Sequence, residues 1–365
     1  MVHVVSDGMT SGLHALDRHG DQEAGDGMLD FAVNVRGPAP SFVRSAIGVT
    51  LDDLARYPSH AASARTCAAI ANVHGRATDE VMLLAGAADG FELLPKLGVR
   101  HAALLQPSFT EPELVLRAAG IAVTQVVIDP AQPIDADVAS RIPPDADLVV
   151  VGNPTNPTSM LHDADGLAGL RRPGRVLVVD EAFADLTIDP VSGRTEPQSL
   201  AHRRFDDVIV VRSVTKTFGL AGLRAGYLLG APDLLARLQS GRRAWPLSSP
   251  ALAALAACVS EQGVRFCAEQ AIAVRAERDH LVRRLDEIGV SVSAPPSAPF
   301  VLIELPHAFA IRESLRNNGI AVRSAANFVG LGDDHVRLAV RPADQVDRLV
   351  TALERAREEI SVGHS

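Results

Sequence analysis

Two lysines are conspicuous in this sequence because almost all of its basic side chains are arginines. Of the 35 basic residues, only Lys96 and Lys216 are lysine. A lysine ammonium can lose its proton and act as a nucleophilic amine, whereas an arginine guanidinium stays protonated. Lys96 lies beside Gly98 at the end of a predicted helix, where a solvated charge is expected. Lys216 is therefore the candidate for amine chemistry.

Other unusual polar side chains follow predicted strands of a buried sheet. Asp180 comes directly after the apolar run 175–179. Ser213 and Lys216 follow the next run, at 208–211. Because ligands bind at the carboxyl ends of the strands in open α/β sheets, we expect these side chains to converge on one crevice.

This set of residues suits a cofactor that carries an aldehyde, a pyridine ring and a phosphate. Lys216 can form a Schiff base with the aldehyde, and Asp180 can pair with the pyridinium nitrogen. Phe109 offers a face to stack on the ring, and the Asn156 amide can donate to the ring oxygen. The phosphate could be held by side chains and by backbone amides at the start of a helix, namely Ser213, Arg224, Gly86, Ala87 and Ala88.

The elements that position these residues read as an α/β fold with a large doubly wound, mostly parallel sheet. Continuous β-branched runs followed by turn signals indicate strands that are buried on both faces. The predicted strands are 81–84, 102–105, 122–128, 148–151, 175–179 and 208–211. The sequence thus predicts a large cofactor-binding domain over residues 46–245.

The C-terminal third predicts a smaller α/β domain over residues 246–365, joined to the first by a long helix. Helical patterns cover 251–289, 308–318 and 343–360, and the predicted strands are 300–304, 320–323 and 335–341. We expect the N-terminal segment, residues 1–45, to pack with this smaller domain.

Composition excludes several classes of protein. The 365 residues carry 35 basic and 44 acidic side chains, which disfavours nucleic acid and anionic membrane surfaces as partners. The sequence predicts neither a membrane span nor a signal peptide. Cys67, Cys258 and Cys267 are too widely spaced for a zinc site and suit a reducing compartment. We therefore expect a cytoplasmic protein without a metal.

Three segments resemble a known family. They are Asn156-Pro-Thr158, Asp180-Glu-Ala-Phe183 and the stretch from Ser213 through Lys216 and Arg224 to Tyr227. These segments resemble the fold type I aminotransferases that use pyridoxal 5′-phosphate. The most similar branch comprises histidinol-phosphate aminotransferase and threonine-phosphate decarboxylase of the cobalamin pathway. The resemblance covers about residues 19–355.

The resemblance implies a specific role for each residue of the site. It implies Lys216 as the Schiff-base lysine, Asp180 as the pyridinium partner, and the cofactor residues already named in the same roles. Tyr57 resembles a tyrosine that reaches the cofactor phosphate of the neighbouring subunit, so a homodimer is implied. Arg337 matches the arginine that binds the substrate carboxylate, and Asn34 lies in the loop that faces the substrate.

Three residues depart from the family pattern. Phe183 stands where most aminotransferases have a tyrosine that donates to the ring hydroxyl. Ser159 replaces the usual glycine after Asn-Pro-Thr, which predicts a change in the local turn. Arg36 replaces the second asparagine of the usual Asn-x-Asn-Pro motif, which affects the loop that faces the substrate.

The same site can support two reactions. If Arg337 holds the substrate carboxylate in the ring plane, the Cα–H bond is exposed and Lys216 can shuttle the proton, which gives transamination. If arginines grip a side-chain phosphate instead, the carboxylate can leave as carbon dioxide. Three arginines, Arg323, Arg337 and Arg341, are more than one carboxylate needs and suggest a phosphorylated substrate.

We rank an aminotransferase-type reaction first, with a small phosphorylated amino acid or amine as substrate and a link to cobalamin biosynthesis. L-threonine-O-3-phosphate decarboxylation is the close alternative, because Phe183, Arg341 and the motif His19-Gly-Asp21 look more like that branch. Histidinol-phosphate transamination is a further alternative. A catalytically silent binding protein is disfavoured by the intact pair of Lys216 and Asp180.

Overall fold

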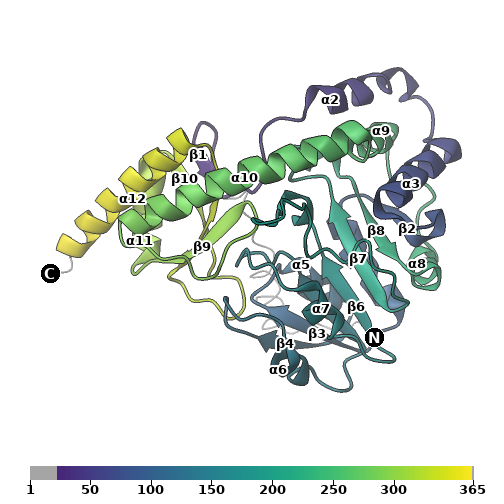
Figure 1. Ribbon diagram of the computed structural model, residues 1–365, viewed down its shortest axis with the longest axis horizontal. Coiled ribbons are helices and arrows are strands. Elements are labelled where there is room, and N and C mark those ends of the chain that lie inside the picture. Colours follow the sequence, from purple (N-terminus) through teal and green to yellow (C-terminus); the bar gives the residue numbers. More distant parts are fainter. Residues whose placement is uncertain (1–22, 364–365) are drawn as a thin grey trace, which may run out of the picture.

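The structure is a computed structural model that describes residues 23–363. It contains a seven-stranded sheet in the order β2-β8-β7-β6-β5-β3-β4 and a four-stranded sheet in the order β1-β10-β11-β9 (Figure 1). The strands of the larger sheet are β2 (Val81–Leu84), β3 (His101–Gln106), β4 (Ala122–Val127), β5 (Leu148–Gly152), β6 (Val176–Asp180), β7 (Val208–Ser213) and β8 (Gly226–Gly230). The expected α/β architecture is confirmed.

The strands predicted from apolar runs match six strands of this sheet, and only β8 has no predicted counterpart. β8 pairs antiparallel with both β2 and β7, whereas the remaining pairs are parallel. Its sequence, Gly-Tyr-Leu-Leu-Gly, is bounded by glycines and lies directly after a motif that reads as a loop. Tertiary pairing between two buried strands, rather than local propensity, makes this segment a strand.

Helices cover both faces of the seven-stranded sheet. Alternate side chains of the strands enter two separate hydrophobic clusters, one on each face. The helices that contribute to one face are α4 (Ala87–Leu93), α5 (Glu111–Ala118) and α8 (Pro232–Gln239). Those on the other face are α2 (Ser41–Gly48), α3 (His60–His74), α6 (Ala136–Ser140), α7 (Ala164–Ala168) and α9 (Ser249–Cys258). Short 3₁₀ turns are η2 (Leu51–Asp53), η3 (Thr78–Glu80), η4 (Leu94–Leu97), η5 (Ala184–Leu186) and η6 (Ala221–Leu223).

The four-stranded sheet combines the two ends of the chain. Its strands are β1 (Leu29–Phe31), β9 (Phe300–Glu304), β10 (Ile320–Ser324) and β11 (His335–Ala339). β1 pairs parallel with β10, with Leu29 opposite Ile320. The helices α11 (Ala308–Asn317) and α12 (Ala343–Gly363) pack against this sheet and against each other. The motif His19-Gly-Asp21 lies outside the described residues.

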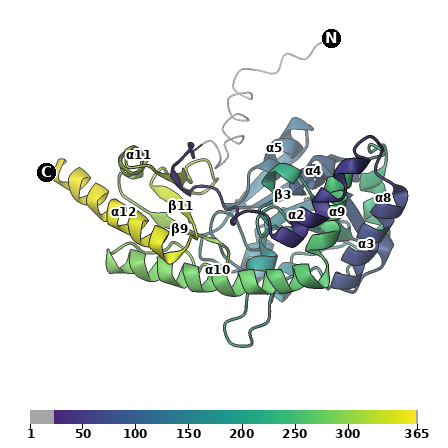
Figure 2. The same cartoon turned by 90° about the horizontal axis from the view of Figure 1, so that it is seen from above.

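The helix predicted over 251–289 is in fact two helices, and that prediction is corrected. α9 ends at Cys258, and α10 (Glu261–Glu287) begins after a bend of 66°. The hydroxyl of Ser260 accepts the Gly263 N–H at 3.2 Å and thereby caps the new helix. α10 then runs along the molecule from the larger sheet to the smaller one (Figures 1 and 2). No single helix among residues 23–363 is long and apolar enough to cross a membrane, although α9 and α10 pass that test as a bent pair.

Candidate active site

A cavity of about 390 Å³ is lined by residues of both sheets and of the segment after β1. Most of the residues predicted from the sequence lie on its wall, namely Asn34, Ala87, Ala88, Phe109, Asn156, Asp180, Ser213, Lys216, Arg224 and Arg337. Asp180 and Ser213 end neighbouring strands, and Phe109, Asn156 and Lys216 follow strand ends, as expected for an open α/β sheet. Within residues 23–363, no group of three or more His, Cys, Asp or Glu side chains is placed to hold a metal ion.

Asp180 is the last residue of β6, and its carboxylate lines the cavity. Desolvation raises its pKa to about 7, and the nearby carboxylates of Glu111 and Glu181 add to this effect. The Ala182 N–H, which donates to Asp180 Oδ1 at 3.0 Å, and the charge of Lys216 act in the opposite direction. A cationic N–H donor at this carboxylate, such as a pyridinium nitrogen, would favour its ionised form.

Arg224 on the cavity wall, with Gly86 lying against it, fits a phosphate. Gly86 has a φ of 84°, and a Cβ built there would lie 2.9 Å from Arg224 Nη2. Only glycine therefore allows the Arg224 guanidinium to lie against this turn. Ala87 and Ala88 follow in the first turn of α4, and Ser213 ends β7 beside them. A guanidinium, a hydroxyl and helix N-terminal amides together suit a dianion.

The backbone around Lys216 is fixed on two sides. The carbonyl of Lys216 accepts the Arg36 N–H at 3.0 Å, which ties it to the segment after β1. On the other side, the hydroxyl of buried Thr217 donates to Asp185 Oδ2 at 2.7 Å. Desolvation raises the pKa of Asp185 to about 6. These contacts restrict the backbone from which the Lys216 amine projects.

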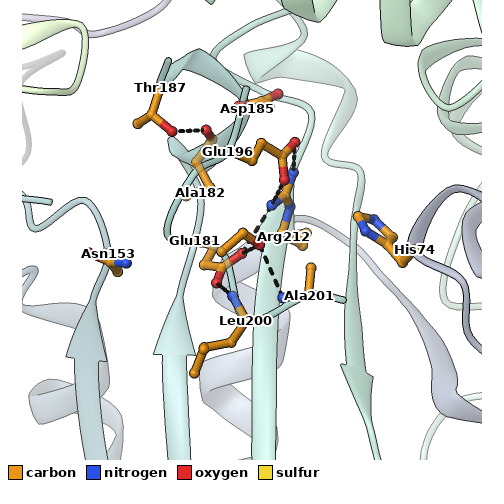
Figure 3. Close-up of polar contacts among 12 residues, drawn as sticks. His74, Asn153, Glu181, Ala182, Asp185, Thr187, Glu196, Leu200, Ala201 and Arg212 are labelled. Atoms are coloured by element: carbon orange, nitrogen blue, oxygen red, sulfur yellow. Dashed lines mark hydrogen bonds and ion pairs between the residues drawn. The ribbon is translucent and has the colours of Figure 1, made fainter. Parts of the chain in front are cut away.

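Figure 3 shows a buried network of charges behind these strand ends. Arg212 pairs with Glu181 at 3.0 Å and with both oxygens of Glu196 at 2.8 Å. Glu181 also accepts the Ser199 hydroxyl at 2.6 Å and the Leu200 N–H at 2.7 Å. The side chains of Glu181 and Arg212 are 0% and 6% exposed. Each carboxylate oxygen of Glu181 therefore has a partner despite complete burial.

The network and the cavity share two strands. Glu181 directly follows Asp180, and Arg212 directly precedes Ser213. Because successive residues of an extended strand point to opposite sides, one residue of each pair lines the cavity and the other enters the network. Glu181 and Arg212 were not predicted from the sequence, although a charged residue next to each strand-end site residue was a usable signal.

The network continues to an imidazole. His74 Nε2 and the Tyr227 hydroxyl are 2.8 Å apart, and both side chains are buried. Desolvation, assisted by the charge of Arg212, lowers the pKa of His74 to about 3. His74 is therefore neutral at physiological pH and adds no further positive charge to the network.

Arg337 brings a buried positive charge to the cavity from β11. Its Nη1 donates to Asn156 Oδ1 at 2.6 Å and its Nη2 donates to the Ala32 carbonyl at 2.6 Å. Desolvation, with the charge of Arg323, lowers its pKa to about 9. No carboxylate of residues 23–363 forms an ion pair with Arg337. An anionic group of a ligand would stabilise this guanidinium.

The structure does not bring the other two predicted arginines to the cavity wall. Arg341 donates to the backbone carbonyls of Asp30 and Val33 and so anchors the segment after β1. Arg323 lies opposite Arg337 in the β10–β11 pairing, and its Nη2 donates to Asn327 Oδ1 at 2.9 Å. Both side chains have acceptors away from the cavity wall, so their predicted substrate role has no direct geometric support.

Three other predicted or departing residues have distinct surroundings. Tyr57 is 75% exposed and stacks on Trp245 with ring centroids 4.2 Å apart, away from the cavity of its own chain. Arg36 turns toward α10, where its Nη1 pairs with Glu277 at 2.6 Å. Phe183 lines the cavity and offers no hydroxyl to a ligand.

Replacing Arg212 with leucine should destabilise the fold strongly. Glu181 would stay buried without a cation, and the loss of one partner of a buried pair costs about 3–5 kcal/mol. Urea unfolding of Arg212→Leu against the unmodified protein measures this loss. Arg265→Ala is the matched control, because its ion pair with Glu261 is solvent-exposed and contributes less than about 1 kcal/mol. Equal stability of the two variants would contradict the role given to the network.

The comparisons with known proteins agree with this geometry. Residues 28–353 match the family model described as aminotransferase class I and II. A histidinol-phosphate aminotransferase of Mycobacterium tuberculosis is 49% identical over 334 residues, which cover 91% of this chain and 89% of the relative. A threonine-phosphate decarboxylase of Salmonella typhimurium is 28% identical and covers 90% of this chain and 91% of its own length.

A solved structure shares the fold of this chain. The histidinol-phosphate aminotransferase of Sinorhizobium meliloti, in complex with pyridoxal 5′-phosphate, superposes with a TM-score of 0.79 at 20% identity. That superposition covers 98% of this chain and 96% of the other. The family model and the relative at 49% identity both cover most of the chain, and the sheet order agrees with them. The chain therefore belongs to the pyridoxal 5′-phosphate-dependent family of class I and II aminotransferases.

Proposed function

We propose that the enzyme transfers the amino group of a small phosphorylated amino acid or amine to an oxo acid. The observation that carries this proposal is Arg337, a buried guanidinium without an ion-pair partner in residues 23–363, on the same wall as Lys216. The relative at 49% identity, named a histidinol-phosphate aminotransferase, makes histidinol phosphate the first amino donor to test.

The residues of the cavity fit pyridoxal 5′-phosphate. Its pyridinium nitrogen would present a cation to Asp180, whose ionised form burial disfavours, and its phosphate would suit the turn of Gly86 and Arg224. The Asn34 side-chain oxygen is buried without a partner in residues 23–363, which leaves it available to a ligand. When bound, the cofactor supplies an aldehyde that condenses with amines and a ring that accepts electrons.

Three side chains of the cavity would then have separate roles in the reaction. Asp180, kept ionised by a pyridinium partner, would hold the proton of the ring nitrogen in place. Lys216 Nζ would take and return the proton of the substrate α-carbon. Arg337, fixed by Asn156 and Ala32, would hold an anionic group of the substrate and so decide which α-carbon bond stands upright against the ring.

Decarboxylation of L-threonine O-3-phosphate is the second candidate. It is favoured by Phe183, which stands where most aminotransferases have a hydroxyl donor, and by the relative that is named a threonine-phosphate decarboxylase. A link to cobalamin biosynthesis belongs to this candidate. We also propose that the enzyme acts in the cytoplasm and that its domain borders lie at residues 45 and 245.

Two incubations distinguish the candidates. Cofactor-loaded enzyme is mixed with histidinol phosphate and an oxo acid, or with L-threonine O-phosphate alone. We expect amino transfer in the first mixture and, in the second, conversion of the cofactor to its amine form without carbon dioxide. Sustained carbon dioxide release from the second mixture, with the cofactor absorbance restored, would overturn transamination in favour of decarboxylation.

The Asp180→Asn variant should make the cofactor-free protein more stable and its binding of the cofactor weaker. An unfolded aspartate has a pKa of about 3.9, so the folded cofactor-free protein binds more protons between about pH 4 and pH 7. Its stability therefore falls as pH rises through this window. Removing the carboxyl abolishes this dependence and should stabilise the cofactor-free protein at pH 8 by about 2–4 kcal/mol.

The same variant should bind pyridoxal 5′-phosphate at least about tenfold more weakly, since an amide cannot neutralise the pyridinium. Thermal unfolding at pH 5 and pH 8 and a fluorescence titration of the cofactor measure the two effects. An Asp180→Asn protein that retains full cofactor affinity would exclude Asp180 as the pyridinium partner.

We also propose a homodimer in which Tyr57 reaches the site of the partner subunit. The support is an exposed apolar surface over α2, η2 and the following loop. Besides Tyr57 and Trp245, it contains Val49, Leu51 and Leu54, which are 77%, 56% and 63% exposed. Such an exposed apolar surface is typical of an interface between chains.

Leu54→Asp should convert this dimer to a monomer, because a carboxylate in an apolar interface is costly to desolvate. Sedimentation velocity measures the change. Tyr57→Phe should leave the dimer intact and weaken cofactor binding severalfold. Val191→Asp is the control, since Val191 is 94% exposed in another loop and should alter neither property. A monomeric unmodified protein would rule the dimer out.

A further inference from the structure

Ser159 occupies a backbone conformation that normally belongs to glycine. It follows Asn156 by three residues, has a φ of 65° and is 0% exposed. In this left-handed region a residue with a Cβ is sterically strained. A glycine would adopt the same turn without that strain. The serine side chain should therefore contribute something that a glycine cannot.

The Ser159 hydroxyl connects the turn after β5 to the segment that leads into β9. Its oxygen accepts the backbone N–H of Ser297 at 3.0 Å and that of Ala298 at 2.7 Å. The Ser159 carbonyl also accepts the Ser297 N–H, at 2.8 Å. The turn follows β5 of the seven-stranded sheet, whereas β9 belongs to the four-stranded sheet. These bonds therefore cross between the two sheets, which form the two layers of the molecule at this point.

This connection lies next to the groups that face the substrate. Two residues after Ala298, the ring of Phe300 packs edge-on against Phe183 with centroids 4.9 Å apart. The Arg337 guanidinium lies 5.4 Å from the centroid of the Phe300 ring and bonds Asn156 from the other layer. The position of Phe300 thus affects where Arg337 lies relative to Asn156.

We propose that Ser159 is a positioning residue that clamps the two layers together and sets the width of the cavity at its Arg337 end. The clamp fixes the distance over which a substrate's anionic group must reach from the amine at Lys216. It thereby selects amino compounds whose carboxylate or phosphate lies at one particular spacing from the reacting nitrogen. This inference rests on the proposed function for its substrate class.

The Ser159→Gly variant tests the clamp with little disturbance of the backbone. Glycine removes the hydroxyl, relieves the left-handed conformation and keeps the bond from the Ser297 N–H to the carbonyl of residue 159. We expect hydrogen exchange in the 297–300 segment to accelerate at least about tenfold. With the amino donor identified above, KM should rise about fivefold or more while kcat falls less. Discrimination between phosphorylated and plain amino donors should decrease.

A matched control removes the same backbone strain elsewhere. His307 has a φ of 62° and is exposed at the start of α11, away from the cavity. His307→Gly should leave exchange in the 297–300 segment, KM and kcat unchanged. Ser159→Ala, which loses the hydroxyl but keeps the strain, should repeat the exchange result and be less stable than Ser159→Gly.

The readouts separate failure of the clamp from failure of the proposed function. Unchanged exchange in Ser159→Gly would overturn the clamp, whatever the substrate. Faster exchange without a change in KM or discrimination would overturn its effect on the cavity. If the unmodified enzyme turns over neither phosphorylated amine, the proposed substrate class is wrong, but the exchange comparison still decides whether Ser159 joins the layers.

Discussion

The ion pair between Arg212 and Glu181 is the constraint on which the cavity depends. It joins the ends of β6 and β7 at the positions next to Asp180 and Ser213. Burying these charges is costly, and the cost is offset because Glu196 pairs with the guanidinium and backbone and hydroxyl donors satisfy the carboxylate. The strand ends are thereby held by directional bonds on the side away from the cavity, where a ligand does not compete for them.

Much of the fold was predictable because its signals are local. Continuous β-branched runs marked the parallel strands, and the strand-end positions of Asp180, Ser213 and Asn156 placed these residues on the cavity wall. Strand β8 was missed because it depends on pairing with β2 and β7. The break between α9 and α10 was missed because Ser260 can cap a helix only where the chain bends, and the surrounding alanine-rich sequence favours helix throughout.

The positions of some arginine side chains, by contrast, could not be predicted from the sequence. Arg337 matches a family motif, and Arg323 and Arg341 were predicted beside it as substrate residues, yet of the three only Arg337 lines the cavity. A guanidinium has five donors on a long stem, so its final position depends on which acceptors lie within reach. For Arg341 these are carbonyls of β1 and of the segment after it, which are more than 300 residues away in the chain. No local pattern encodes that contact, whereas strand-end placement is encoded locally.

The chemical character of the cavity follows from two opposite charges that the chain leaves partly uncompensated. In the chain alone, desolvation pushes the pKa of Asp180 up to about 7 and that of Arg337 down to about 9, so burial disfavours the ionised form of both groups. A ligand that presents a cation to Asp180 and an anion to Arg337 reverses both effects at once. Because the unfolded chain cannot offer this paired environment, binding such a ligand must also stabilise the fold. The part of the chain that discriminates between ligands is therefore also the part whose stability depends most on having one bound.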